Sequence, residues 1–259
     1  MRSVLMIGLL AISTWAVAAS QEVLTVEQAW QRLDKIDKKI AASQAPATLY
    51  VQRGHYNLEM LEFEDALADF DRALQLDPKQ DEAHYGRGMA LGRMGMVQDG
   101  ITALTTYISL HPDSSVAYTK RGVRHLWAGD DLAAEQDLLK ALQLNPDNAE
   151  AHDDIGVVYA RRQDYTRGID HFTRTVTLDP TYLKGFHNLG MAYYLTGRDT
   201  LALFAVEQAL ALNPRERNTL LLKAQILQAM GQLEEAAKVA DEAEFLPASG
   251  DWSERVPVQ

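Results

Sequence analysis

Apolar residues recur along most of the chain at steps of three and four, which places them on one face of a helix. One such stretch contains Ala66, Leu67, Phe70, Ala73 and Leu74. No competing alternation of apolar and polar residues, the mark of a half-buried strand, interrupts this pattern. The pattern therefore predicts an all-α protein.

The helical stretches repeat with a constant period along the chain, equal to the separation in sequence between Pro78 and Pro112. Prolines recur at this step, and a glycine precedes each of them by 24 residues: Pro78, Pro112, Pro146, Pro180 and Pro214 follow Gly54, Gly88, Gly122, Gly156 and Gly190. A second glycine series comprises Gly95, Gly129, Gly197 and Gly231, with Gln163 in the gap. Glycine permits the turn after a helix, and the residue before a proline resists the helical conformation. Each period is therefore predicted to be a pair of helices.

This period and its residues resemble the tetratricopeptide repeat family, whose units are about 34 residues long. The family motif has a large residue, Leu-Gly and Tyr in the first helix, then Ala, Phe, Ala and Pro in and after the second. The clearest match is Phe186, Leu189, Gly190, Tyr193, Ala202, Ala209 and Pro214. The resemblance implies a right-handed superhelical solenoid of helix pairs. It covers six units: 47–80, 81–114, 115–148, 149–182, 183–216 and a degenerate 217–250.

Residues 20–46 predict one amphipathic helix that caps the start of the array, with an apolar stripe of Ala29, Trp30, Leu33, Ile36 and Ile40. A membrane-binding helix is the alternative, but the polar face mixes Glu, Asp and Lys rather than being basic. At the other end, residues 251–259 predict a flexible tail, in which Trp252 either docks back or binds a partner.

Residues 1–19 have the pattern of a secretory signal peptide: Arg2, an apolar run over 4–17, and small residues at the cleavage offsets. The run is shorter than the roughly 20 residues of a membrane span. We therefore predict a bacterial periplasmic protein, with an uncleaved inner-membrane anchor as the alternative. The absence of cysteine is compatible with an oxidising compartment.

Composition and motifs exclude several classes of function. There are 36 acidic and 25 basic residues, a net charge of -11, so phosphate backbones are repelled and nucleic acid is a poor partner. No cysteine means no thiolate nucleophile and no Cys-ligated metal. Motifs for nucleotide binding, zinc proteolysis or a serine nucleophile are absent, and the repeats occupy nearly all of the length. We expect no enzymatic activity, no catalytic residues, no cofactor and no metal site.

In the tetratricopeptide repeat family the first helices line a concave groove that binds peptides or helices of other proteins. Its groove-facing positions, transferred by register, are Val51, His55, Tyr85, Met89, Arg93, Thr119, Val123, Trp127, Asp153, Val157, His187, Met191 and Tyr194. Met, Tyr and Trp in one stripe suit peptide recognition, since soft and aromatic side chains dominate interface energetics. Packing against the neighbouring repeat is the alternative for any one of them. The Lys and Asn clamp with which chaperone-binding members hold a carboxylate matches no unit.

The unit 81–114 contains five of the sixteen glycines, at Gly86, Gly88, Gly92, Gly95 and Gly100. Interior helix glycines cost about 1 kcal/mol each relative to alanine. The missing side chains suggest a pocket or a flexible joint, with drift in a tolerant repeat as the simpler interpretation.

Two charged groups have structural interpretations that we favour. The arginines Arg53, Arg87 and Arg121 recur at the step of the repeat, and they either hold an acidic peptide or pair with acids 16 residues later. Asp69 and Asp137 are those acids, whereas Arg87 faces Ala103 and needs another partner. The cluster Glu150, Asp153 and Asp154 beside His152 favours a solvated acidic edge over a metal site.

Together these features predict a non-catalytic protein–protein interaction scaffold or adaptor in the cell envelope. It would bind a peptide or helix of one or more envelope proteins in the concave groove, and would contact the membrane only through an uncleaved N-terminal segment. The alternatives are a membrane-anchored assembly factor and a self-associating scaffold, a homo-oligomer formed by end-to-end stacking.

Overall fold

The computed structural model describes residues 26–42 and 45–246, and side chains from residue 31 onward. The predicted signal peptide and the tail 251–259 lie outside these residues. The described part contains thirteen helices and no strand, which confirms the all-α prediction.

One helix precedes six helix pairs. The single helix is α1 (Val26–Ala42), where a capping helix was predicted. The pairs are α2 (Ala47–Glu59) with α3 (Phe63–Leu76), α4 (Asp81–Arg93) with α5 (Val97–Leu110), α6 (Ser115–Trp127) with α7 (Asp131–Leu144), α8 (Ala149–Arg161) with α9 (Tyr165–Leu178), α10 (Leu183–Leu195) with α11 (Asp199–Leu212), and α12 (Arg217–Ala229) with α13 (Leu233–Glu244).

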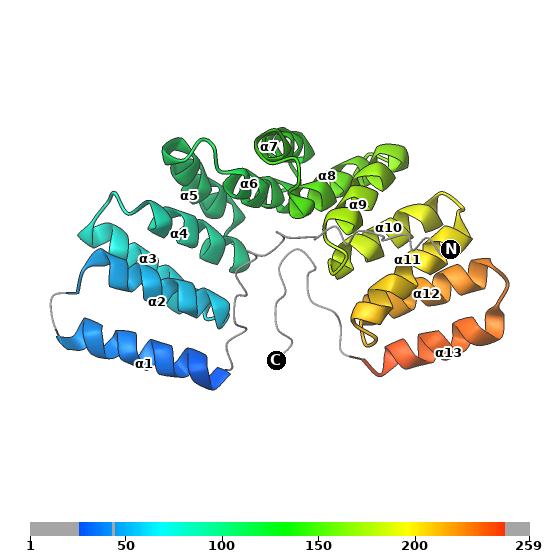
Figure 1. The fold of residues 1–259 in the computed structure, drawn as a ribbon, viewed down its shortest axis with the longest axis horizontal. Coiled ribbons are helices and arrows are strands. Elements are labelled where there is room, and N and C mark those ends of the chain that lie inside the picture. Colours follow the sequence, from blue (N-terminus) through cyan, green and yellow to red (C-terminus); the bar gives the residue numbers. More distant parts are fainter. Residues whose placement is uncertain (1–25, 43–44, 247–259) are drawn as a thin grey trace, which may run out of the picture.

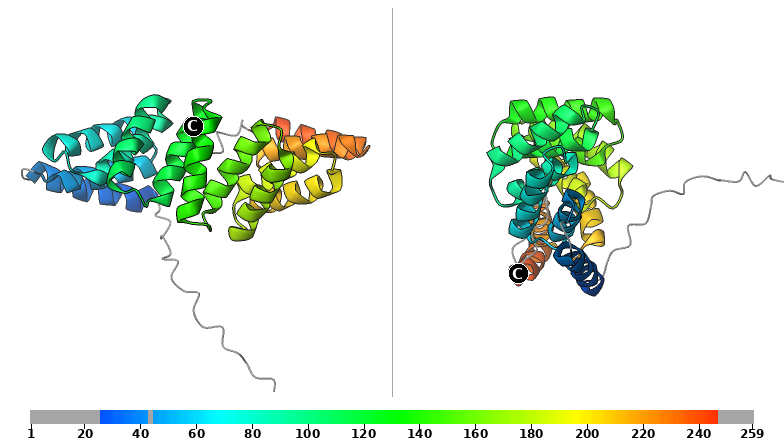
Figure 2. Two further views of the ribbon diagram at one scale, coloured as in Figure 1. Left: turned by 90° about the horizontal axis from the view of Figure 1, so that it is seen from above. Right: turned by 90° about the vertical axis from the view of Figure 1, so that its left-hand side faces the viewer.

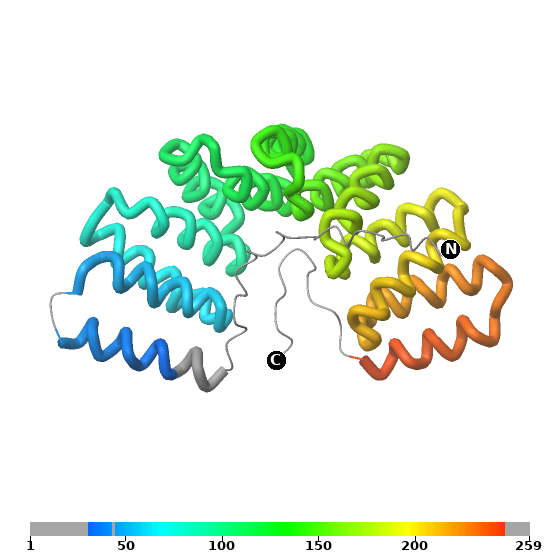
Figure 3. The backbone as a smooth tube through the Cα atoms, viewed as in Figure 1, coloured from blue at the N-terminus to red at the C-terminus, as the bar shows by residue number. Residues whose placement is uncertain are grey.

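The pairs stack into an arch, with α1 and α13 at its two feet and α7 at its top (Figure 1). Seen from above, the helices stand side by side along the length of the molecule (Figure 2). The chain advances from one foot to the other without returning to an earlier pair (Figure 3). Each even-numbered helix contacts the next even-numbered one, whereas no two odd-numbered helices contact each other in the described residues. The even helices therefore form an inner layer and the odd helices from α3 onward an outer layer.

The turns within the pairs follow the second glycine series. Gly95, Gly129, Gly197 and Gly231 have φ between 70° and 78°, the left-handed region that glycine adopts without strain. Gln163, which replaces the glycine in its unit, has φ 61°. Leu61 occupies the same place in the first unit, with φ 68°. The odd helices α3, α5, α7, α9 and α11 each end two residues before the proline, as predicted.

The first glycine series is required by packing inside each pair. A Cβ atom at any of these glycines would lie 2.6–2.9 Å from a large side chain on the second helix of the same pair. Those side chains are buried: Phe70, Leu104, Leu138, Phe172 and Val206 are at most 2% exposed. In the sixth unit both partners change, because Ala224 replaces the glycine and Ala240 replaces the large residue. The small–large complementarity thus explains the repeat and its degenerate end.

The glycines of 81–114 do not form a pocket. A Cβ atom at Gly86 would overlap the ring of Phe70, and one at Gly92 would overlap the guanidinium group of Arg124. The side chain of Arg124 is fully buried and lies over the ring of Trp127, with its Cζ atom 4.4 Å from the ring centroid. The pocket hypothesis is wrong, because neighbouring units fill the space that the glycines leave. The flexible-joint hypothesis stays a prediction.

The arginine series links successive helix pairs. Arg53 Nη2 donates to Asp69 at 2.6 Å, and Arg121 Nη2 donates to Asp137 at 2.7 Å, as predicted. Arg87 Nε donates to Asp71 at 2.7 Å, so Asp71 takes the place of the acid that Arg87 lacks within its own unit.

Arg53 also donates to Asp37 on the preceding helix α1, and Arg121 also donates to Thr105 on the preceding helix α5. Arg87 reaches its preceding helix, α3, through Asp71 itself. The series is therefore structural, since it ties the inner helix of one unit to the preceding helix of the array.

Gly86→Ala tests this packing. Alanine normally stabilises a helix interior by up to about 1 kcal/mol relative to glycine. Here the ring of Phe70 is wedged between Gly86 and Gly54, so the methyl group has no room. We expect a loss of about 2 kcal/mol in the free energy of unfolding, measured by urea denaturation.

The matched control is Gly86→Ala in a Phe70→Leu background, where the shorter side chain removes the overlap. There the substitution should be neutral or stabilising. Equal destabilisation in both backgrounds would contradict the packing argument.

Candidate functional site

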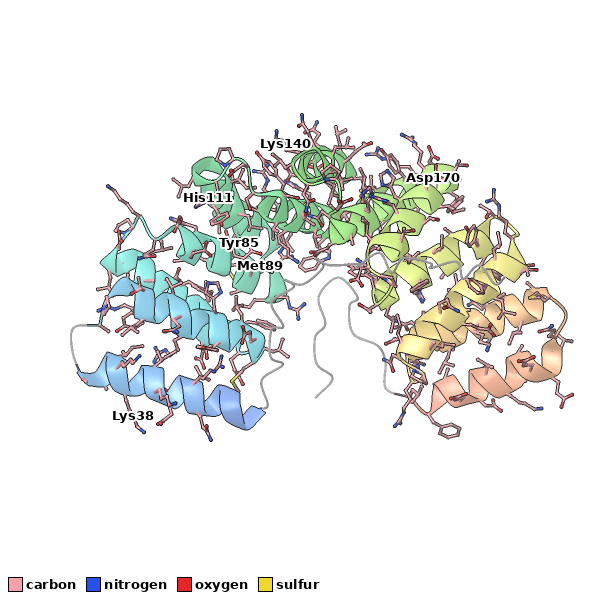
Figure 4. The ribbon with its side chains drawn as sticks, viewed as in Figure 1. Lys38, Tyr85, Met89, His111, Lys140 and Asp170 are labelled. Atoms are coloured by element: carbon pink, nitrogen blue, oxygen red, sulfur yellow. The ribbon has the colours of Figure 1, made fainter. Side chains whose placement is uncertain are left out.

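The thirteen candidate residues all lie on even-numbered helices, from α2 to α10. Nine are half-buried: Val51, His55, Tyr85, Met89, Arg93, Trp127, Val157, Met191 and Tyr194. The other four, Thr119, Val123, Asp153 and His187, are buried. Tyr85 and Met89 lie on the inner side of the arch, whereas Lys140 and Asp170 lie on its outer side (Figure 4).

Five of the half-buried residues lie on the adjacent helices α2 and α4, and we call them the N-terminal patch: Val51, His55, Tyr85, Met89 and Arg93. The ring of His55 meets Phe70 edge-on at 5.2 Å, and burial lowers its pKa. His55 is therefore a neutral, mainly apolar part of this surface.

An aromatic row extends from the N-terminal patch to the outer layer. The rings of Tyr85 and Tyr107 lie 5.2 Å apart, and Tyr107 stacks on His111 at 4.5 Å. Tyr107 donates its hydroxyl to Glu82 at 3.3 Å, and burial raises the pKa of Tyr107 to about 12. These contacts hold Tyr85 in place, so a ligand would meet an ordered ring at little entropic cost.

The far edge of the patch is cationic and aromatic. The guanidinium of Arg93 lies over Phe63, 5.1 Å from the ring centroid. Arg124 Nη2 lies 3.7 Å from the sulfur of Met89, and its guanidinium covers Trp127. Met89 and Trp127 are thus joined through a buried arginine that reaches across from α6.

The residues Val157, Met191 and Tyr194 form a second group on α8 and α10, the C-terminal patch. Met191 and Tyr194 pack against a buried cluster that contains Val206, Leu222 and Ile226. Part of each side chain is therefore committed to the core, and only the remainder is available to a ligand.

Several inner positions on α6, α8 and α10 are closed. Thr119 is fully buried, and its hydroxyl accepts from Asn148 Nδ2 at 3.0 Å. Val123 is 1% exposed, and His187 lies 3.1 Å from the hydroxyl of Thr219 through its Nδ1. The register placed these positions correctly on the inner helices, but neighbouring units cover them, so they do not line an open groove.

Asp153 and Asp154 form a buried ionic cluster rather than the expected solvated edge. They are 0% and 2% exposed, and Lys184 Nζ lies 2.8 Å from Asp153 and 3.0 Å from Asp154. Burial raises the pKa of Asp154 well above its ordinary value. The expectation was wrong because Lys184, one unit further along the array, covers both carboxylates.

The neighbouring residue His152 makes two polar contacts within the array. Its Nδ1 lies 2.9 Å from Nδ1 of His171, and its Nε2 lies 3.1 Å from the carbonyl oxygen of Pro146. Burial lowers the pKa of both histidines. Among the described residues, no group of three or more His, Asp or Glu side chains is arranged to hold a metal ion.

Two hollows at the ends of the array were not identified from the sequence. The N-terminal one, of about 520 Å³, lies between α1, α2 and α3 and includes Asp37, Arg53 and Asp69. The C-terminal one, of about 350 Å³, lies between α12 and α13 and includes Leu221, Ala236 and Ala240. The only sequence signal for the second is the loss of the large residue at Ala240, which leaves room beside the last helix pair.

No helix in the described part of the chain is long and apolar enough to cross a membrane.

Family models cover most of the array. A model described as TPR repeat matches residues 62–95, and models described as tetratricopeptide repeat match residues 82–114, 119–182 and 183–216. Human tetratricopeptide repeat protein 6 is 27% identical over 178 residues, which are 68% of this chain and 34% of that protein. The chain spans about a third or less of the length of the curated relatives that it matches first.

Solved structures share the fold. The structure of the APC/C hetero-tetramer Cut9–Hcn1 superposes with a TM-score of 0.71 at 21% identity, over 83% of this chain and 46% of that one. YrrB, described as a TPR protein with an unusual peptide-binding site, gives a TM-score of 0.53 at 22% identity, over 70% of this chain and 94% of that one.

The pKa of His187 tests whether the inner surface is closed at this position on α10. Burial lowers this pKa from 6.5 to about 4, against a smaller opposing effect of Asp153. The folded state therefore disfavours the charged ring, and stability falls as pH drops from 6.5 towards 4. The loss attributable to this group is about 3 kcal/mol.

Histidine NMR titration gives the pKa directly, and His187→Gln should remove this share of the acid destabilisation. A His187 pKa near its ordinary value would mean that the ring faces solvent and that the inner surface is open there.

Proposed function

The chain belongs to the tetratricopeptide repeat family, and on that premise we propose that it is a non-catalytic scaffold that binds a segment of a partner protein on its inner surface. The N-terminal patch supports this proposal most directly. It combines aliphatic, aromatic, thioether and guanidinium groups within two neighbouring helices. These are the side chains that contribute most to protein interfaces.

The chemistry of the patch indicates the kind of segment that it would bind. Apolar contacts with Val51, Tyr85 and Met89 suit a segment with two or three large apolar side chains. The net charge of -11 favours a partner with basic flanking residues. A short amphipathic helix or an extended apolar peptide with Lys or Arg meets both requirements.

Two similar proteins support binding of a partner chain by this fold. YrrB is described as having a peptide-binding site, and Cut9 occurs in a hetero-tetramer with Hcn1. The fold is shared at low identity, so these proteins support the class of function and leave the partner to be identified.

We place the protein in the periplasm on the basis of residues 1–19. Their charged start, apolar run and small residues are those of a signal peptide. The envelope partners follow from that location. A membrane-anchored assembly factor is the alternative if the segment is retained.

Tyr85→Glu with Met89→Glu tests the binding surface. Two carboxylates would replace apolar contact surface and would have to lose their hydration on binding, so capture of the partner should fall about tenfold or more. The measurement is a pull-down from detergent-solubilised envelope with residues 20–259 as bait, followed by an affinity titration with the identified partner.

The matched control carries Gln136→Glu and Gln143→Glu, two exposed positions on the outer helix α7. It adds the same two carboxylates and should bind like the wild type. A partner that both variants retain equally would move the binding site away from the N-terminal patch.

The intact mass of the protein purified from its native envelope tests the location. Cleavage after the predicted segment 1–19 would remove about 2 kDa, at an average residue mass of about 110 Da. The full mass in the membrane fraction would favour the anchored alternative.

A further inference from the structure

Helix α11 is rich in apolar residues. Ten of its fourteen residues are Ala, Leu, Val or Phe. Ala202, Ala205, Val206 and Ala209 are buried against the neighbouring helices. On the opposite side, Leu201 is 48% exposed and Phe204 is 63% exposed. Thr200 and Glu207 are exposed on the same side, and Leu201 and Phe204 are apolar side chains that the described chain leaves largely uncovered.

The other units show that these two residues are unusual. At the positions of Leu201 and Phe204, the corresponding pairs are Asp65 with Ala68, Asp99 with Thr102, Ala133 with Gln136, Arg167 with Asp170, and Glu235 with Lys238. Asp170 lies on the outer side of the arch (Figure 4). Phe204 holds the same register in the next unit, so its ring faces outward from the outer layer.

We propose that the chain pairs with a second copy of itself through the outer side of α11, about a two-fold axis parallel to that helix. In this arrangement Leu201 meets Leu201 and Phe204 meets Phe204, and the two rings shield each other from water.

The charges on the flanking helices select this arrangement. An axis parallel to α11 brings α9 of one copy opposite α13 of the other, at equal register. Three pairs of opposite charge then face each other: Arg167 with Glu235, Asp170 with Lys238, and Arg174 with Glu242. An axis perpendicular to α11 would bring α9 against α9 and lose this complementarity.

The flanking basic side chains have partners within one copy, which they would exchange on pairing, and Arg167 also lies over the ring of Tyr159, 4.2 Å from its centroid. Arg167 is paired with Asp164, Arg174 with Asp147, and Lys238 with Glu234, all within one copy. The side chains of the three basic residues are 47–72% exposed, so these pairs contribute little. The outer surface is convex, so the copies approach most closely at α11, and the long charged side chains reach across from either side.

A second copy accounts for the surface better than an unrelated partner. An isologous interface needs one patch that complements itself, and the apolar centre with α9 and α13 of complementary charge on either side meets that requirement. The pairing leaves both inner surfaces free, because the inner layers face away from each other. It is independent of what the inner surface binds, and it would give one assembly two such surfaces.

Phe204→Glu tests the pairing in the full protein. The average mass in solution, measured by light scattering across a concentration series, should rise towards twice the monomer mass for the wild type. For Phe204→Glu it should stay at the monomer mass, a difference of about twofold. Leu132→Glu on α7 is the matched control, because Leu132 is 63% exposed, like Phe204, but lies outside the proposed interface. It should associate like the wild type.

A charge exchange tests the register. Arg174→Glu should shift the association midpoint to higher concentration, and Arg174→Glu with Glu242→Arg should restore it, since each side chain faces the other across the axis. Circular dichroism checks that each variant is folded.

Three results would overturn the proposal. The wild type could remain monomeric at its highest soluble concentration. Phe204→Glu could associate as strongly as the wild type. Leu132→Glu could dissociate as fully as Phe204→Glu, which would indicate non-specific adhesion of exposed apolar residues.

Discussion

The fold depends on one close contact that recurs in the first five units, between a glycine of the first helix and a large side chain of the second. In the pair of Gly54 and Phe70, the missing Cβ lets the ring sit against the helix backbone. Interiors are packed as densely as organic crystals, so a change on one side requires a change on the other. The sixth unit shows this coupling, since it has alanine at both positions, Ala224 and Ala240.

The same packing decides which inner residues can meet a ligand. At the middle of the arch, on α6 and α8, Thr119, Val123 and Asp153 are covered. Towards the N-terminus, residues at the same register positions remain partly open, and Tyr85 and Met89 lie there. The open part of the inner surface is therefore interrupted by buried positions on α6, α8 and α10 rather than forming one continuous groove. Polar groups at these buried positions are held by partners within the array, such as Lys184 beside Asp153.

The sequence predicted the helices and turns well, but predicted the contacts between repeat units less well. Periodicity located the helices, the proline stops and the glycine turns because these depend on local backbone preferences. The resemblance to the family implied the pairs of Arg53 with Asp69 and Arg121 with Asp137, which the structure contains. Contacts between units were harder to foresee. Asp71 as the partner of Arg87, the ring of Phe70 against Gly86, and Lys184 over Asp154 all depend on the twist between neighbours, which a repeat pattern does not encode.

Site-specific photo-crosslinking in cells would test the central claim that the inner surface at α4 binds a partner segment. A photoreactive residue would replace Met89 on the inner side or Lys140 on the outer side, one at a time. The account predicts a discrete crosslinked partner from position 89 and none from position 140. A crosslink of that partner from position 140 alone, or from both positions equally, would contradict it.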